Sequence, residues 1–178
     1  QAFEKPERRA IRGHASVLSA QTVFEGPGKR EWARYAARFA LEAVAAGASA
    51  IYVETSGKVF APSAVVGLDV RDPQVLFHLF VEVSGDAAAI STEGMQAFDL
   101  PEVVVRYGRR DRGPAQVACF GLAAEMACDA RTLALGETYQ ASLSAPHYTC
   151  VAMEPGEVSE DPFVNPRGQI VLELSPGQ

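Results

Sequence analysis

The sequence predicts an α+β fold, with a mixed or antiparallel sheet and two main helices on one face of it. Two long segments place apolar residues at helical spacing, one at about residues 29–46 and one starting near residue 113. Between and around them lie short segments rich in β-branched and aromatic residues, separated by glycine and proline, which is typical of strands. A chain of 178 residues can bury one core without disulfides or metals. We therefore expect a single domain over residues 13–178, preceded by a flexible arm over residues 1–12.

Alternating apolar residues predict the strands. The segment 75–83 is the clearest, because Val75, Phe77 and Leu79 alternate with a second, partly apolar set of side chains. This favours a strand inside the sheet. Further strands are predicted at residues 14–24, 50–54, 102–107, 132–139, 147–153 and 169–174, and an exposed acidic loop at residues 154–166.

The two predicted helices have similar surroundings. Gly47 is expected to end the first helix, and Pro114 to lie in the first turn of the second. The buried stripe of the second helix is predicted to be Val117, Phe120, Gly121, Ala124 and Cys128. Each helix carries a Phe–small–Leu sequence and is followed by a strand, which suggests duplicated βαβ(β) units. In that case Phe39 and Phe120 are equivalent buried residues, each costing about 3–5 kcal/mol on truncation to alanine.

The three cysteines do not form a disulfide framework, because at least one stays unpaired. Cys119 and Cys128 lie nine residues apart on the second predicted helix, a rise of about 13.5 Å, beyond the roughly 7 Å that a disulfide spans. No spacing is typical of a zinc site. We expect small buried thiols, no metal, no cofactor and a reducing, cytoplasmic location.

Charge and hydropathy restrict the partners. The formal net charge of -6 argues against general nucleic-acid binding, which needs a broad basic surface. No apolar run approaches the roughly 20 residues that span a bilayer. The predicted partner is an unidentified protein or a small anionic ligand, and the oligomeric state stays open.

One distinctive segment, residues 91–102, allows two interpretations. As a structured loop, it uses Gly94 for an unusual backbone angle and fills the core with Met95 and Phe98. As a site, its carboxylates would join others to hold a divalent metal or act as a general base. The candidate residues for that acidic site are Glu54, Glu93, Glu102 and Glu137. We favour the loop, because most exposed carboxylates are simply solvated.

An arginine-rich run precedes the second helix. A helix N-terminus has free amides and partial positive charge, and guanidinium groups beside it suit a phosphate or carboxylate. The candidate anion-binding residues are Arg106, Arg109, Arg110 and Arg112. The alternatives are a solvated loop, or a contact with the acidic 154–161 loop of another copy.

His147 and Cys150 suggest a nucleophile–base pair. On a continuous strand, residues at an odd separation point to opposite faces. Only a bulge between the two residues would bring them together.

Part of the sequence resembles a bacterial family labelled domain of unknown function 4261. The resemblance covers most of the chain after about Val23 and includes Ala45-Ala46-Gly47-Ala48, Ala50-Ile51-Tyr52, Ser56-Gly57, Thr92-x-Gly94-Met95-x-x-Phe98-x-Leu100-Pro101-Glu102 and, after a helix, Leu135-Gly136-Glu137-Thr138. Asp99 stands where that family is expected to carry glycine. The resemblance implies a shared fold and a bacterial origin, and it carries no activity to transfer.

Two functional hypotheses follow. The first is a binding or protein-interaction module, because no Walker loop, dinucleotide fingerprint, HExxH or Gly-x-Ser-x-Gly motif occurs. The second is a small enzyme that uses the carboxylate candidates, with or without a divalent metal.

Overall fold

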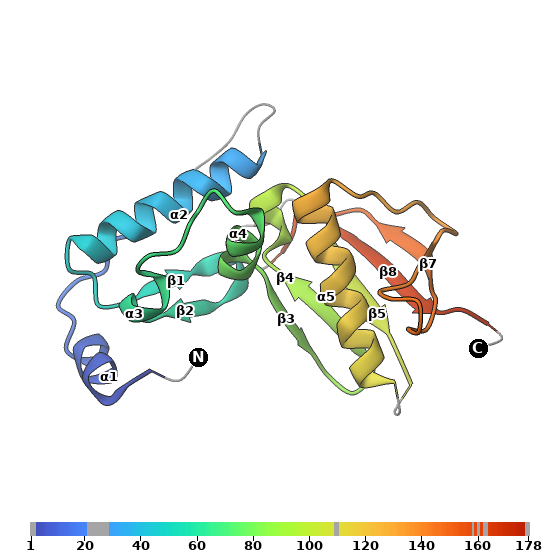
Figure 1. Ribbon diagram of the computed structural model, residues 1–178, viewed down its shortest axis with the longest axis horizontal. Helices are drawn as coiled ribbons and strands as arrows, with labels where there is room; N and C mark the ends of the chain where they lie inside the picture. Colours follow the sequence, from blue (N-terminus) through green and yellow to red (C-terminus); the bar gives the residue numbers. More distant parts are fainter. Residues whose placement is uncertain are drawn as a thin grey trace.

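The computed structural model describes residues 3–20, 29–108, 111–157, 159, 161 and 164–176. Within these residues the chain forms a six-stranded sheet of order β3-β4-β5-β8-β7-β6, a separate hairpin β1-β2, and several helices (Figure 1). The predicted α+β class and mixed sheet are confirmed.

The six-stranded sheet consists of two antiparallel halves. The first half is β3 (Glu82–Gly85), β4 (Ala89–Glu93) and β5 (Glu102–Arg106), and the second is β8 (Gln169–Leu174), β7 (Tyr148–Glu154) and β6 (Thr138–Tyr139). A parallel pairing of β5 with β8 joins the halves. The strands predicted at residues 102–107, 147–153 and 169–174 are therefore present.

The long helix α5 (Arg112–Asp129) covers β3, β4 and β5 (Figure 1). Its sheet-facing side consists mainly of small residues, and the buried set is Ala115, Ala118, Cys119, Leu122, Ala123, Met126 and Ala127. Cys119 Sγ lies 3.3 Å from the Val103 carbonyl oxygen. Small side chains let the helix approach the sheet closely. The predicted stripe was wrong at Val117 and Phe120, which are 58% and 39% exposed, whereas Ala124 and Cys128 of that stripe are partly buried against the core.

The helix predicted at residues 29–46 is α2 (Lys29–Ala45), but it does not share a sheet face with α5. Its buried residues Ala33 and Ala37 belong to a side that packs against α4 (Pro73–Phe80) and the short helix η2 (Met95–Phe98). Because α4 contacts both long helices, it separates α2 from α5.

The strand predicted at 75–83 was wrong over most of its length, because residues 73–80 form α4. Asp72 caps this helix by accepting a hydrogen bond of 2.8 Å from the Gln74 amide, and Pro73 occupies the first turn. A short segment that is apolar at odd and even positions also fits a buried helix, and Leu76 and Phe77 are both 1% exposed. Within the predicted segment 75–83, only its last two residues are extended, as the start of β3.

Before α4, the chain forms the hairpin of β1 (Ile51–Val53) and β2 (Lys58–Phe60), joined by the 3-10 turn η1 (Glu54–Ser56), and then α3 (Pro62–Val65). The strand predicted at 50–54 is thus confirmed.

Two predicted strands are absent or shorter in the described residues. Residues 14–20 contain no strand, and Val17 is 81% exposed, so its side chain packs on nothing that would order one; residues 21–24 lie outside the described part. Residues 132–137 are irregular, and only β6 is extended. Within the predicted arm, α1 (Lys5–Arg12) is helical with no buried residue, and the division between arm and domain stays a prediction.

The predicted duplication is wrong in its main element. Phe39 is 46% exposed and Phe120 39% exposed, so neither is a core residue. The strand after α2 enters the hairpin, whereas the strand after α5 enters the six-stranded sheet. The two helix–strand units therefore have different surroundings.

Candidate functional site

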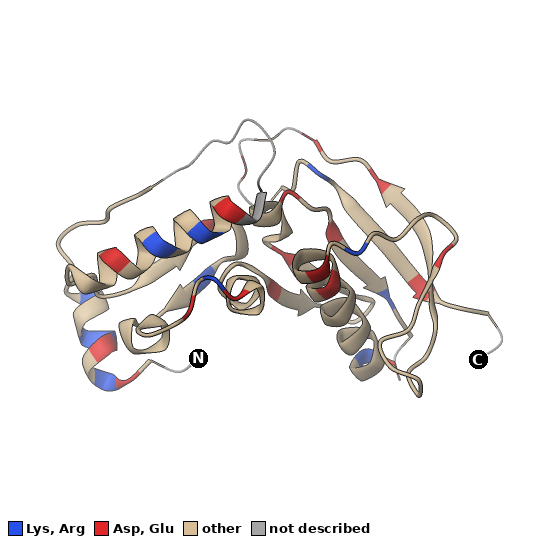
Figure 2. Cartoon of the chain, turned by 45° about the horizontal axis from the view of Figure 1, so that its top comes forward, with Lys and Arg blue, Asp and Glu red and all other residues tan. Residues whose placement is uncertain are grey.

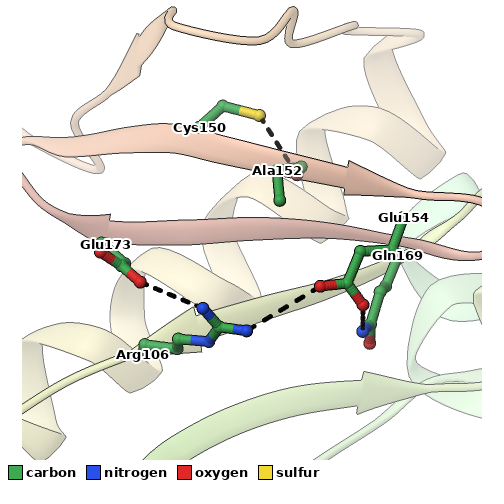
Figure 3. Close-up of polar contacts among 6 residues, drawn as sticks. All are labelled: Arg106, Cys150, Ala152, Glu154, Gln169 and Glu173. Atoms are coloured by element: carbon green, nitrogen blue, oxygen red, sulfur yellow. Dashed lines mark hydrogen bonds and ion pairs between the residues drawn. The ribbon is translucent and has the colours of Figure 1, made fainter.

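Arg106, the first arginine of the predicted anion site, is held by two carboxylates of its own chain. Its Nη1 lies 3.2 Å from Glu173 Oε1 and its Nη2 lies 3.9 Å from Glu154 Oε1 (Figure 3). Arg112 donates to the Gly85 carbonyl at 3.4 Å. Arg109 and Arg110 lie outside the described residues. Arg106 thus interacts with acidic residues of the sheet, which compete with an external anion.

Glu102 organises the distinctive segment predicted from the sequence. Its Oε2 accepts a hydrogen bond of 2.6 Å from the Thr92 hydroxyl, and its Oε1 accepts from the amides of Gly94 and Met95 at 3.2 and 3.0 Å. The Asn165 side chain donates to the same Oε1 at 2.8 Å. The carboxylate therefore joins the start of β5 to the turn before it and to the loop before β8.

The partners of Glu102 are themselves fixed. The Thr92 oxygen accepts from the Val103 amide at 2.8 Å, and the Asn165 side chain also donates to the Leu100 carbonyl at 2.9 Å. Burial raises the pKa of Glu102, and the hydrogen bonds from Thr92, Asn165 and the two amides oppose that rise. Such a fully engaged carboxylate stabilises a turn and offers few free lone pairs to a ligand.

The other carboxylate candidates lie in different places. Glu54 is exposed in η1, Glu93 accepts from the Ser84 hydroxyl at 2.8 Å, and Glu137 accepts from the Ala134 amide in its own turn at 2.7 Å. Among the residues that the structure describes, no group of three or more His, Cys, Asp or Glu residues is arranged to hold a metal ion.

The strand β7 does contain a bulge, but not between His147 and Cys150. The pairing with β8 shifts between Cys150 and Ala152. Cys150 Sγ instead points along its own strand, 3.7 Å from the Ala152 carbonyl (Figure 3). Burial raises the pKa of the Cys150 thiol, which disfavours the nucleophilic thiolate.

The structure brings together an apolar patch that sequence reasoning missed. We define it as His78, Val117 and Phe120. The Phe120 ring lies 5.6 Å from the His78 ring and 5.3 Å from the buried ring of Phe77, while Val117 is 58% exposed. The composition of α5 could have indicated this patch from the sequence. Its polar residues are limited to Arg112, Gln116, Glu125 and Asp129, so apolar residues remain for the outer side of the helix as well as for its inner side.

Comparisons with family models, curated proteins and solved structures gave no match to this chain. The family resemblance described above therefore stays a prediction. No helix in the described ranges is long and apolar enough to cross a membrane.

Proposed function

We propose that this domain is a protein-interaction module, and that the apolar patch of α4 and α5 docks onto an uncharged, apolar surface of another protein. The observation that carries the proposal is the outward position of Val117 and Phe120 within the stretch of α5 from Ala115 to Ala124, which contains no charged residue. A surface helix of a monomer normally turns polar residues outward. Exposed neighbouring apolar residues on such a helix are typical of a binding surface.

The chemistry of the partner follows from the patch. Burying a charged group against Val117 and Phe120 would cost its hydration without an opposite charge to replace it. The partner is therefore expected to present aliphatic or aromatic side chains there. The His78 ring, which lies beside the Phe120 ring at a tilt of 33°, extends the contact area onto α4.

The arrangement of the carboxylates supports the alternative hypothesis, a small enzyme, less than the apolar patch supports the interaction module. Glu102 is occupied by the turn that it stabilises, and Glu93 and Glu137 each accept a hydrogen bond from a neighbouring residue. No observation of the described carboxylates favours a reaction.

Site-specific crosslinking tests the module. A photoreactive residue replaces Val117 in one version of the protein and Leu143, which is 101% exposed and lies outside the patch, in a matched control. In the cells that make the protein, we expect one discrete crosslinked partner from position 117 and none from position 143. The same product should fade when Phe120→Asp is added. Equal, diffuse crosslinking from both positions would argue against the module.

A further inference from the structure

The hairpin of β1 and β2 has two free edges. It is separate from the six-stranded sheet, and among the described residues neither of its strands makes a backbone hydrogen bond beyond the hairpin. An edge of this kind presents unpaired amide and carbonyl groups, which are a template for a further strand. A two-stranded hairpin is also only marginally stable by itself. The hairpin can therefore accept a third strand.

The outer face of the hairpin is apolar. Tyr52 and Val59 lie directly opposite each other in the strand register and are 58% and 42% exposed. The inner face is fixed to the rest of the molecule, because Ile51 and Val53 pack against the core. Lys58 Nζ also donates to two carbonyl oxygens at the end of α4, at 2.7 and 2.9 Å. The hairpin is therefore a fixed template with an exposed apolar pair that the side chains of an added strand would flank.

The same chain contains a segment that has the composition of a strand but no partner. Residues 15–20 carry no charge, no glycine and no proline, and they lie between the charged helices α1 and α2 (Figure 2); such a composition allows β-pairing. They are exposed, adopt no helix or strand, and make no backbone hydrogen bond to another described residue. Val17 and Leu18 are 81% and 78% exposed. Six extended residues span about 20 Å, so the segment is long enough to pair along either three-residue strand of the hairpin.

The free segment and the free edges belong to the same end of the molecule. The Ser63 hydroxyl of α3, just after β2, donates to Glu7 of α1 at 2.6 Å, and the segment begins soon after α1. Figure 1 shows α1, α3 and the hairpin together at the end opposite the six-stranded sheet. Two copies that meet at this end would each offer one unpaired segment and one unpaired edge. Exchange of identical segments between two copies gives a closed two-fold arrangement in which every contact occurs twice.

We propose that the hairpin is a strand-addition site whose occupant is residues 15–20 of a second copy of this chain. The segment becomes extended only on association, when it adds to a free edge of the hairpin. Backbone hydrogen bonds then give the affinity, and Val17 or Leu18 lies beside Tyr52 and Val59 on the outer face. Because the segment carries no charge, its burial costs no ionic hydration. This inference goes beyond the apolar patch, since it concerns other elements and does not depend on docking by α4 and α5.

Sedimentation of the full chain over a range of concentrations tests the exchange, and we expect a reversible dimer. The amides of adjacent residues point to opposite edges of a strand, so the double variant Val17→Pro with Leu18→Pro removes a donor from the new pairing in either register. It should weaken the dimer about tenfold or more. The matched control, Val17→Ile with Leu18→Ile, keeps both amides and strand-forming side chains, and should change the dimer affinity less than about threefold.

Crosslinking between distinguishable copies locates the contact without the proline variant. A copy with a photoreactive residue in place of Leu18 is mixed with a copy that is uniformly labelled with heavy nitrogen. We expect crosslinks that join the light peptide around position 18 to heavy peptides from residues 51–60. A monomer at every concentration, a dimer that the two prolines leave unchanged, or crosslinks to other heavy peptides would each overturn the proposal. So would a lack of crosslinks between light and heavy chains, which is the result if the segment pairs within its own chain.

Discussion

Gly94 allows the chain to turn between β4 and β5. Its φ of 102° lies in the left-handed region, and an added Cβ would lie 2.0 Å from the Phe80 carbonyl oxygen. Two costs therefore add at one position, a strained backbone and a contact with another segment of the main chain.

We predict that Gly94→Ala lowers the free energy of unfolding by about 3 kcal/mol or more, because strain of about 1–2 kcal/mol is joined by a clash with the end of α4. Gly47 is the matched control, since its φ is 100° and nothing lies within 4 Å of an added Cβ. Gly47→Ala should cost only the strain. Urea denaturation measures both, and equal losses would contradict the clash.

Glu102 is expected to make stability depend on pH. Its pKa is raised by burial, so the folded state binds more protons than the unfolded state between the ordinary glutamate pKa and the raised one. The free energy of unfolding that Glu102 contributes is therefore highest below that window and falls as pH rises through it. Titration of the Glu102 carboxyl by NMR should give a pKa above 4.5.

We further predict that Glu102→Gln destabilises the fold at neutral pH by about 1–3 kcal/mol, because the amide NH₂ replaces one of the two accepting oxygens and faces a donor in place of an acceptor. Glu93→Gln, at an exposed hydrogen bond to Ser84, should change stability by less than about 0.5 kcal/mol. Thermal or urea melts compare the two, and similar effects would show that the Glu102 hydrogen bonds contribute little.

The sequence predicted part of this turn. Gly94 does adopt an unusual backbone angle, and Met95 and Phe98 are buried at 0% and 3% exposure, as local composition indicated. The role of Glu102 was beyond local reasoning, because its partner Asn165 lies 63 positions away. Asp99, in place of the glycine expected from the family, still adopts a left-handed φ of 56°.

At the scale of elements, the main error concerned α4. Alternation of apolar residues predicted a strand, but the Asp72–Pro73 pair is a helix start signal, and tertiary contacts on two sides bury the helix. The helices α2 and α5 were predictable because their periodicity extends over several turns. Their partners were not, since helical spacing identifies an apolar side and not the element that covers it.

The cap of α4 gives a direct prediction. Asp72→Ala removes the acceptor for the Gln74 amide and should lower the free energy of unfolding by about 1 kcal/mol. Asp129→Ala, at the exposed end of α5, is the control and should have little effect. Chemical denaturation checks the difference, and a neutral Asp72→Ala would mean that packing alone determines where α4 begins.

Phe39 of α2, Phe77 of α4 and Phe120 of α5 should differ in their contributions to stability. Phe77→Ala empties a site that is 1% exposed and is expected to cost about 3–5 kcal/mol. Phe120→Ala and Phe39→Ala remove rings that are partly in water, so each should cost only about 1–2 kcal/mol. If Phe120→Ala matches Phe77→Ala in a denaturation series, Phe120 is a core residue and the apolar patch is smaller than described.

At the scale of the whole molecule, the cysteines report on opening of the fold. Burial, followed by the charge of Glu102, raises the pKa of the Cys119 thiol to about 12, and Cys150 is also buried. We predict that Cys128, which is partly exposed, reacts first with a thiol reagent at neutral pH. The other two should react only as fast as the protein unfolds. Unfolded protein, in which all three react quickly, is the control, and rapid labelling of Cys119 in the native state would contradict its burial.

The parallel pairing of β5 with β8 has a consequence for the order of folding. The antiparallel pairs β3–β4 and β7–β8 are each consecutive in the chain, so their pairing closes shorter loops than the pairing of β5 with β8 does. The pairing of β5 with β8 must enclose the whole of α5, β6 and β7, and a long loop costs more entropy to close. We therefore expect the two halves of the sheet to form early and their junction last, so that the slow step of refolding is the docking of β8 against β5.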